Sequence, residues 1–513
     1  MFSKVLSAGI SGVDAYLVRV EADVSEGMPQ FQMVGYLASE VKEAGDRVRT
    51  ALRNAGYPLP AKRITVNLAP AGVRKAGSRF DLPVAAAVLA SMQKLPAKNL
   101  ERVMIAGELS LSGQVLRIPG VLALVEAAKA AGVRRCIVPK GNAEEGAVIE
   151  EVEVTGVSHL AEMIEILRHP GKAERSRVDL QKLLEKTSEY LEEDFSQING
   201  QKTLRRAAEI AAAGMHNFLM IGPPGSGKTM VAKRMPGILP SMSLEECLCL
   251  TKIYSAAGLL PEENSFLSRR PFRAPHHTIT PEALAGSGRM PTPGEISLST
   301  GGILFLDEFL EFKRAVLEIL RQPLEERRIC ISRSGGSYIF PADFMLVAAM
   351  NPCSCGYYPD RSRCQCPAGE IKRYLGRLSQ PILDRIDICA EAPLLSYEEL
   401  QSREENESSE TIRRRVETAH RIQKERYQGL AVLHNAGLGA KETERFCRIG
   451  EKEDRLLQSM FETLPFSARS YHRILRVART IADLDGKSRI GEEHILEAMG
   501  YRPPDRNEWM RGV

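Results

Sequence analysis

The residues with the clearest chemistry form a run of eight, GPPGSGKT, which matches the phosphate-loop pattern G-x-x-x-x-G-K-[ST]. An apolar strand pattern at residues 218–221 precedes the run and a helical pattern follows it, which is the context that the motif requires. Glycines let backbone N–H groups surround phosphate oxygens, the lysine reaches the β and γ oxygens, and the threonine ligates Mg²⁺. The run therefore predicts a site for ATP and Mg²⁺ made by Gly222, Pro223, Pro224, Gly225, Ser226, Gly227, Lys228 and Thr229.

Polar side chains follow two further apolar segments. Asp307 and Glu308 end the segment at 302–306, where Asp307 is expected to coordinate Mg²⁺ and Glu308 to orient and deprotonate the attacking water. The segment at 344–350 ends in Asn351. Because ligands bind at the carboxyl ends of parallel strands, we expect Asn351 near the γ-phosphate. The alternative for Asn351 is a simple cap at the end of a strand.

An arginine, Arg385, lies between Asp384 and Asp387 at the end of the same region. An arginine that reaches the γ-phosphate of a neighbouring subunit stabilises the charge that develops during hydrolysis. Hydrolysis then depends on assembly. The sequence therefore predicts an arginine that acts in trans, in a chain that works as a ring.

Four of the ten cysteines, Cys353, Cys355, Cys364 and Cys366, fall in one short segment. Four thiolates make a tetrahedral zinc site, and metal binding would supply folding energy to a turn-rich segment that has little to bury. The spacing argues the other way, since zinc ligand pairs usually enclose two or more residues and each pair here encloses one. A structural zinc site is favoured, with reduced free thiols or a redox-sensing pair as alternatives. A catalytic zinc is not expected, because four protein ligands leave no open position.

Length and composition indicate a folded protein of about three domains. The chain has 513 residues, of which 43% are hydrophobic and 26% charged. We expect it to be cytoplasmic, with no membrane contact, since it shows no signal-peptide pattern and no apolar run long enough to span a bilayer. The net charge of +4 is too small to indicate a nucleic-acid binder, so any such binding must come from local patches.

Three folded units and a linker are predicted to position these residues. Strand and helix patterns alternate through residues 1–168, which predicts an α/β domain. A charge-dense segment, 169–194, is interpreted as a linker that holds one surface helix. Residues 195–393 alternate again and carry the phosphate loop, the carboxylates and the cysteines. Residues 394–513 are helical throughout, which predicts a lid domain.

A β-hairpin is predicted just before the segment that ends in Asn351. Apolar and polar residues alternate through 328–340 around a Gly-Gly pair, which is typical of a hairpin. In a ring, Arg333 on this hairpin would project toward the central pore and contact DNA phosphates. A plain surface hairpin is the alternative.

Residues 269–289 form a second basic segment, with Arg273 and Arg289 as candidate DNA contacts. The segment also holds adjacent histidines, His276 and His277. No carboxylate or thiol is spaced to complete a metal site with them. We therefore expect these histidines to contact phosphate or to make local hydrogen bonds.

These segments together resemble the magnesium-chelatase-like AAA+ ATPases of the YifB/ComM type, over essentially the whole chain. Further matching segments are RPFRAPHH at 270–277, PGEISL at 293–298 and SARSYHRILRVAR at 467–479. The resemblance implies that Asn351 is the sensor-1 residue, Arg385 the trans-acting arginine finger and Arg469 the sensor-2 arginine from the lid. It also implies a DNA-binding hexamer, because ComM-type members are similar to hexameric motors that drive branch migration during homologous recombination of incoming DNA in natural transformation. One departure is SQPILDR at 379–385, where members usually have SGPLLDR.

The N-terminal region resembles the S5-like proteolytic domain of Lon-type proteases, which use a serine–lysine dyad. The resemblance rests on GELSLSGQVLRIPG at residues 107–120 and the helix after it. Where the lysine would lie the chain has Leu122, and Ser78 is the only hydroxyl near the expected serine position. A serine without a group that accepts its proton is not an activated nucleophile. We therefore expect a platform for binding or assembly and no protease activity.

The leading hypothesis is an ATP-driven DNA translocase or branch-migration helicase. One rival is a chelatase-like motor that loads a metal ion into a tetrapyrrole. Such motors need a partner with a D-x-S-x-S adhesion site, a string that this chain lacks. Another rival is a protein-remodelling ATPase or an ATP-dependent protease, and the missing dyad argues against the proteolytic form.

Overall fold

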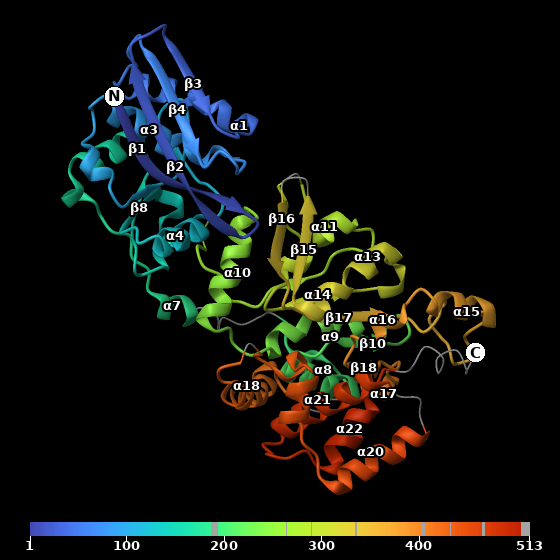
Figure 1. The fold of residues 1–513 in the computed structure, drawn as a ribbon. Coiled ribbons are helices and arrows are strands. Elements are labelled where there is room, and N and C mark those ends of the chain that lie inside the picture. The colour runs from blue at the N-terminus through green and yellow to red at the C-terminus, as the bar shows by residue number, and fades with distance from the viewer. Residues whose placement is uncertain are drawn as a thin grey trace.

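The computed structural model describes residues 1–185, 193–262, 264–288, 290–333, 336–401, 406–430, 432–463 and 467–503 (Figure 1). Its N-terminal part is a mixed seven-stranded sheet in the order β3-β4-β2-β1-β5-β8-β9. β1 and β2 pair antiparallel along a long ribbon whose turn contains Gly12 at φ +68°, a conformation that favours glycine. The strands are β1 (Phe2–Ser11), β2 (Asp14–Ser25), β3 (Gln30–Val34), β4 (Arg63–Ala69), β5 (Val103–Ile105), β8 (Arg135–Pro139) and β9 (Glu153–Val157), beside a small ribbon of β6 (Glu108–Leu109) and β7 (Val115–Leu116).

Helices cover both faces of this sheet. α2, α3 and α6 share one apolar cluster with it, and α4 and α5 share another on the opposite face. Every residue of α3 is buried, as expected for a helix that is apolar on nearly all sides. An α/β fold is thus observed where the alternating patterns predicted one. The helices are α1 (Ser39–Lys42), α2 (Ala44–Asn54), α3 (Asp81–Ser91), α4 (Val121–Ala130), α5 (Ala143–Ala147), α6 (Leu160–Arg168) and α7 (Leu180–Glu185).

A second sheet of five parallel strands forms the middle of the molecule. Its order is β11-β14-β17-β10-β18. β10, the first of these five strands along the chain, therefore lies between β17 and β18, the last two. Because all five strands run in one direction, their carboxyl ends meet at one edge, where ligands of such sheets bind. The strands are β10 (Phe218–Ile221), β11 (Phe272–Arg273), β14 (Ile303–Leu306), β17 (Met345–Met350) and β18 (Ile388–Glu391).

Helices and a hairpin surround this second sheet. The hairpin predicted at 328–340 is present as β15 (Arg328–Arg333) and β16 (Gly336–Pro341), which pair antiparallel. In Figure 1 it stands away from the sheet, close to the end of the β1–β2 ribbon. The other elements are α8 (Lys202–Gly214), α9 (Lys228–Arg234), α10 (Leu244–Ala256), α11 (Pro281–Ala285), α12 (Glu295–Leu298), α13 (Arg314–Ile319), α14 (Arg321–Glu326), α15 (Ala368–Leu375), α16 (Gln380–Leu383), β12 (Gly286–Ser287) and β13 (Thr292–Pro293).

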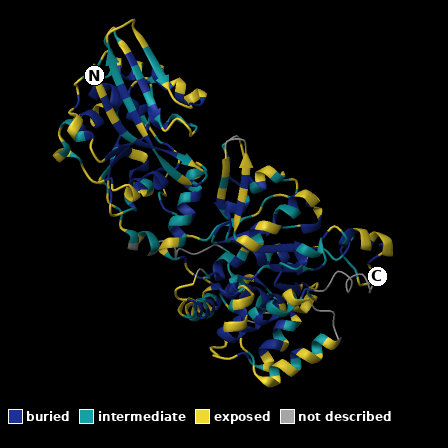
Figure 2. Ribbon diagram, viewed as in Figure 1, coloured by how far each residue is buried: buried dark blue, intermediate teal, exposed yellow. Residues whose placement is uncertain are grey.

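The C-terminal part is helical, as its pattern predicted. α18 and α21 pack against α8, and apolar residues from all three join the strands in a single buried cluster. The continuous dark-blue interior of Figure 2 shows this shared core. The helices are α17 (Tyr397–Gln401), α18 (Ser409–Arg426), α19 (Ala440–Phe446), α20 (Glu451–Thr463), α21 (Ala468–Leu484) and α22 (Glu492–Gly500). None of the helices in the described ranges is both long and apolar enough to cross a bilayer.

The N-terminal part contacts the central part through α10. Lys252 on α10 pairs with Asp14 (2.7 Å) and Glu126 (2.6 Å), both from the N-terminal sheet and its helices. Leu122, at the position where a dyad lysine was sought, is buried in an apolar cluster with residues of α10. α7 lies in the predicted linker, with its leucines half-buried beside this same cluster and Lys182 exposed.

Candidate functional site

The phosphate-loop sequence forms the turn that its motif predicted. β10 ends at Ile221 and α9 begins at Lys228, so the turn lies at the carboxyl edge of the sheet. Gly225 and Gly227 have φ of +78° and +87°, which side chains rarely adopt. A Cβ on Gly222 would lie 2.2 Å from the carbonyl oxygen of Ala392. Glycine is therefore required at these positions by backbone geometry and by packing.

The ammonium of Lys228 lies inside this turn and reaches the third strand. Its Nζ donates to the carbonyl oxygens of Gly222 (2.6 Å) and Pro223 (2.8 Å), and it lies 3.4 Å from Asn351 Oδ1. Burial lowers the pKa of Lys228 to about 8, although the negative charge of Asp307 opposes that shift. A bound phosphate would give this ammonium an anionic partner at hydrogen-bonding distance. The structure thus brings Asn351 to the lysine, as expected for a residue near the γ-phosphate.

Thr229 and Asp307 form the second half of the site. Thr229 Oγ1 donates to Asp307 Oδ2 at 2.7 Å. Neighbouring oxygens of an octahedral Mg²⁺ shell lie about 2.9 Å apart, because each Mg–O bond is about 2.0–2.1 Å. The two side chains therefore fit adjacent positions around one Mg²⁺. Thr229 and Asp307 would hold the cation, which would supply positive charge beside the phosphates.

Glu308 follows Asp307 in a left-handed backbone conformation, with φ +50° and ψ +48°. Its carboxylate is exposed. It lies next to His277, in the connection between β11 and α11, whose Nδ1 is 3.2 Å from Glu308 Oε2. The sequence predicted a local hydrogen-bonding role for this histidine as one option but did not identify its partner. The carboxylate is separated from the histidine by the whole of α11, α12 and β14, so spacing alone could not connect them.

Arg385 lies at the opposite edge of the sheet from the phosphate loop. Its carbonyl accepts a hydrogen bond from Asn217, which directly precedes β10 (2.8 Å). The four residues of β10 span about 13 Å, which is longer than an arginine side chain. The guanidinium of Arg385 pairs with Glu325 and is nearly buried. In a single chain, Arg385 therefore does not reach its own phosphate loop.

Arg469, on α21 of the C-terminal helical part, lies beside Arg385. Its guanidinium is 3.6 Å from Glu325 and 3.8 Å from Asp384. The next turn of α21 is anchored there too, since Arg473 donates to the carbonyl of Ile386 at 2.8 Å. The sequence did not predict this neighbour for Arg469. Within one subunit the predicted sensor-2 arginine lies beside the predicted trans-acting arginine, and its ion-pair partners in the described part of the chain do not belong to the phosphate loop.

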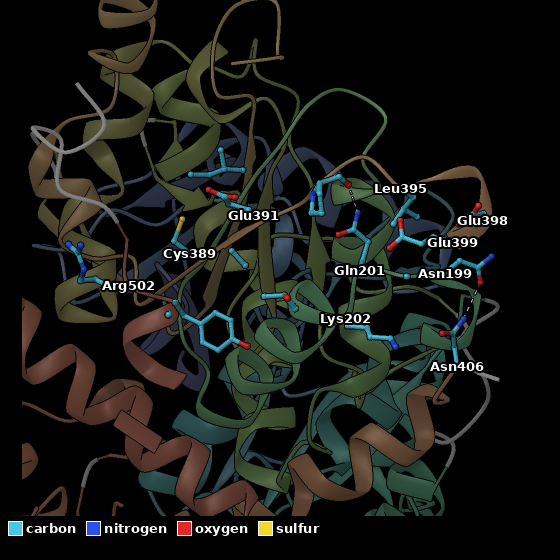
Figure 3. A pocket seen from close by; sticks show the side chains of 17 residues that line it. Asn199, Gln201, Lys202, Cys389, Glu391, Leu395, Glu398, Glu399, Asn406 and Arg502 are labelled. Atoms are coloured by element: carbon cyan, nitrogen blue, oxygen red, sulfur yellow. Dashed lines mark hydrogen bonds between the residues drawn. The ribbon is translucent and has the colours of Figure 1, made fainter. Parts of the chain in front are cut away.

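A cavity of about 940 Å³ adjoins the phosphate loop (Figure 3). Gln201 connects the two, because its amide donates to the carbonyls of Ser226 (3.0 Å) and Pro393 (2.7 Å). Carboxylates of Glu391, Glu398 and Glu399 also line the cavity. Lys202 and Arg502 line it too, so its walls carry both charges, and its volume suits a base and a ribose. No sequence pattern predicted this cavity, although the Asn-Gly turn before α8 is a detectable signal.

The four predicted metal-ligating cysteines converge. Their Sγ atoms all lie within 4.8 Å of one another, with Cys353 3.4 Å from Cys355 and 3.8 Å from Cys364. Sulfurs at the corners of a zinc tetrahedron lie about 3.8 Å apart, because each Zn–S bond is about 2.3 Å. Backbone N–H groups of Gly356 and Tyr358 also point at Cys353 Sγ. The four thiols, which include Cys366, therefore fit one tetrahedral metal ion.

The three predicted DNA contacts differ in their surroundings. Arg333 is exposed at the end of β15, with no acidic group at ion-pair distance among the described residues. Arg273 pairs through two nitrogens with the carboxylate of Glu295, both at 2.6 Å. That carboxylate balances its charge within the subunit, and its contact with DNA stays a prediction. Arg289 lies outside the described residues.

The chain is similar in sequence to known proteins over nearly its whole length. Three family models match: magnesium chelatase subunit ChlI at residues 194–400, subunit ChlI of Mg-chelatase at 20–142, and the ChlI C-terminal region at 406–502. The chain is 44% identical over 501 residues to competence protein ComM of Haemophilus influenzae, which covers 97% of each chain. It is 41% identical over 496 residues to the YifB protein of Escherichia coli, which covers 96% of each. A Lon protease of Roseiflexus castenholzii is 32% identical over 166 residues, which covers 29% of this chain and 20% of the protease.

Proposed function

This chain belongs to the magnesium-chelatase-like AAA+ family of ComM and YifB proteins, and we propose that it is a ring-forming ATPase, of six subunits by resemblance, that moves branched DNA. The observation that carries the ATPase part is the convergence of Lys228, Thr229, Asp307 and Asn351 at one edge of the parallel sheet. ATP and Mg²⁺ are the cofactors that these groups fit. The base and ribose would occupy the adjoining cavity.

Ring formation is supported by where the arginines lie. Arg385 is at the sheet edge opposite its own phosphate loop, and Arg469 is beside it. An arginine placed there contributes to catalysis when assembly brings the phosphate loop of a neighbouring subunit next to it. Two arginines on one surface would meet the same neighbouring phosphates. The AAA+ family membership favours the same kind of assembly.

The choice of DNA as the substrate rests on the hairpin and on the relatives. β15–β16 presents the exposed Arg333 and also Arg328, which pairs with Glu326 at 3.2 Å, and its apolar face, with Ile331 and Phe340, is buried against the core. Basic side chains on a projecting hairpin suit the phosphates of a nucleic acid strand. Similarity to a competence protein over nearly the whole chain supports a role in recombination of incoming DNA. Branch migration by a helicase is the activity that accounts for these features together.

We expect the purified protein to exchange strands of a labelled mobile four-way junction with ATP and not with a non-hydrolysable analogue. Binding should be largely electrostatic, so junction affinity should fall steeply with salt. Arg333→Ala should reduce DNA-stimulated ATP turnover several-fold, leave basal turnover near normal, and lower the log–log salt slope by about one per lost phosphate contact. These quantities are measured by gel assay, coupled ATPase assay and salt titration.

The matched control for this variant is Arg455→Ala, since that arginine is 78% exposed on α20 of the lid, away from the hairpin. It should leave junction affinity and DNA stimulation unchanged. If no DNA alters ATP turnover at low salt and no junction is exchanged, the DNA motor is contradicted and protein remodelling becomes the better proposal.

We also propose that the four cysteines hold a structural zinc ion. Protein purified without chelator should carry about one zinc per chain. Cys353→Ser and Cys364→Ser should each lose it, whereas Cys330→Ser, which alters an exposed cysteine of the hairpin, should keep it. Elemental analysis of protein that has been kept reduced throughout measures this. Metal-free wild-type protein would contradict the zinc site.

A further inference from the structure

The guanidinium of Arg385, the arginine proposed to act in trans, is held within its own subunit. One terminal nitrogen donates to the carbonyl of Pro381, and the other pairs with Glu325 Oε1. Its Nε is buried and has no hydrogen-bond partner in the described part of the chain. The side chain is only 9% exposed. A guanidinium binds phosphate through two parallel N–H groups, so Arg385 must leave Glu325 before it can reach the phosphate of a neighbouring subunit.

The same oxygen of Glu325 also holds Arg469. The guanidinium of Arg469 lies 3.6 Å from Glu325 Oε1, and its side chain is 62% exposed. The hydrogen bond from Arg385 is the main cause of a lowered pKa of Glu325, and the positive charge of Arg469 adds to it, so this carboxylate is ionised at neutral pH. One carboxylate on α14 therefore holds both of the arginines that we propose act on a neighbouring subunit.

The backbone of Arg385 is fixed to other parts of the molecule. Its carbonyl accepts from Asn217, which directly precedes β10, and Arg473 of α21 donates to the carbonyl of Ile386, both at 2.8 Å. Glu325, in contrast, belongs to α14. A movement of α14 relative to the central sheet therefore separates the two charged groups while the backbone of Arg385 stays in place.

α14 is joined to the hairpin through a single residue, Arg327. Its N–H donates to the carbonyl of Pro323 in α14, and its own carbonyl accepts from the N–H of Ala342, the residue after β16, both at 2.9 Å. Its guanidinium is held by Asp343 at 3.0 Å. In Figure 1, α14 lies at the base of the hairpin. The hairpin and α14 therefore turn together about this junction, and a displacement of the hairpin moves Glu325.

We propose that Glu325 is a positioning residue that stores Arg385 in the free subunit and releases it when nucleic acid displaces the β15–β16 hairpin. The inference rests on the proposed function, in which Arg385 acts in trans and DNA contacts the hairpin. Without DNA the ion pair keeps the arginine from the neighbouring phosphate, and ATP turnover stays low. When DNA displaces the hairpin, α14 turns with it and Glu325 withdraws. Each subunit that contacts DNA thereby activates hydrolysis in its neighbour.

Mixed rings of full-length subunits test the storage of Arg385 without DNA. Lys228→Ala subunits donate an arginine but do not hydrolyse ATP, and Arg385→Ala subunits hydrolyse ATP only with a donated arginine. Adding Glu325→Gln to the donor should raise the kcat of mixed rings by about threefold to tenfold, the range for loss of a half-exposed ion pair, with KM for ATP unchanged. The same change in the Arg385→Ala subunit should have no effect, because the arginine that it would release is absent. A merely structural role of Glu325 would not distinguish the two subunits.

A four-way junction tests the release by DNA. Rings with Glu325→Gln in every subunit should show the same rise in basal kcat, and their stimulation by DNA should fall toward one. Glu410→Gln is the matched control, since Glu410 is 52% exposed, against 50% for Glu325, and also pairs with an arginine, Arg414. It should change neither basal nor DNA-stimulated turnover.

The contrary outcomes separate this inference from the function on which it rests. Unchanged or lower turnover with Glu325→Gln in the donor would overturn the storage of Arg385. Undiminished DNA stimulation in rings made only of Glu325→Gln subunits would overturn the release through the hairpin. Mixed rings without any recovery would contradict action in trans, and with it both proposals. If DNA fails to stimulate the wild type, the DNA motor and the release by DNA are contradicted, whereas the storage is still decided by the mixed rings.

Discussion

Glu308→Gln should lose ATP turnover by at least about a hundredfold and hold bound ATP. Glutamine keeps the shape of the side chain but cannot accept a proton from water. Asp307, Thr229 and Lys228 stay in place, so Mg²⁺ and phosphate contacts survive. The measurements are steady-state hydrolysis and the nucleotide content of protein recovered by rapid gel filtration.

Two further variants are compared with Glu308→Gln. Lys228→Ala should lose turnover through loss of phosphate binding, so it should not retain nucleotide. Glu311→Gln changes an exposed carboxylate three residues further on, which pairs with Arg377, and should behave as wild type. Native turnover in Glu308→Gln would show that another group is the base.

Arg385→Ala should lower ATP turnover about a thousandfold, the lower end of the effect measured for arginines that act on a neighbour's phosphate. The variant should still fold and bind ATP, because Arg385 makes no contact with its own phosphate loop among the described residues. The substitution also removes an ion pair with Glu325 and a hydrogen bond to the carbonyl of Pro381, so thermal unfolding of the variant is measured beside its turnover. Turnover and ATP affinity are measured separately to distinguish catalysis from binding.

Mixing variant subunits shows whether Arg385 acts on its own subunit or on a neighbouring one. Arg385→Ala subunits keep an intact phosphate loop, and Lys228→Ala subunits keep an intact arginine, so mixed rings should recover part of the turnover. Arg469→Ala should be rescued in the same way, since Arg469 lies beside Arg385. Arg414→Ala, an exposed arginine of α18, is the control for loss of positive charge. Mixed rings, demonstrated by co-purification of tagged subunits, that show no recovery would contradict action in trans.

The sequence by itself determined the features that depend on local backbone and neighbouring residues. A phosphate loop needs glycines at left-handed positions and a lysine at the start of a helix, and both are encoded within eight residues. The carboxylates at 307–308 and Asn351 end apolar strands, so the parallel sheet had to bring them to one edge. The hairpin at 328–340 and the helices after 394 follow from alternation and helical periodicity. The four cysteines lie within 14 residues, so short turns suffice to bring them together.

The tertiary structure alone decided which distant side chains meet. Arg469 lies beside Arg385 because α21 is anchored on the chain before β18, and no local pattern encodes that docking. The order of the strands brings Arg273 next to Glu295 and His277 next to Glu308. This order is set by the packing of the whole sheet. The cavity beside the phosphate loop likewise collects residues from four separate parts of the chain. Local preferences act over a few residues, whereas these contacts form only when long loops close around a common core, so sequence spacing carries little information about them.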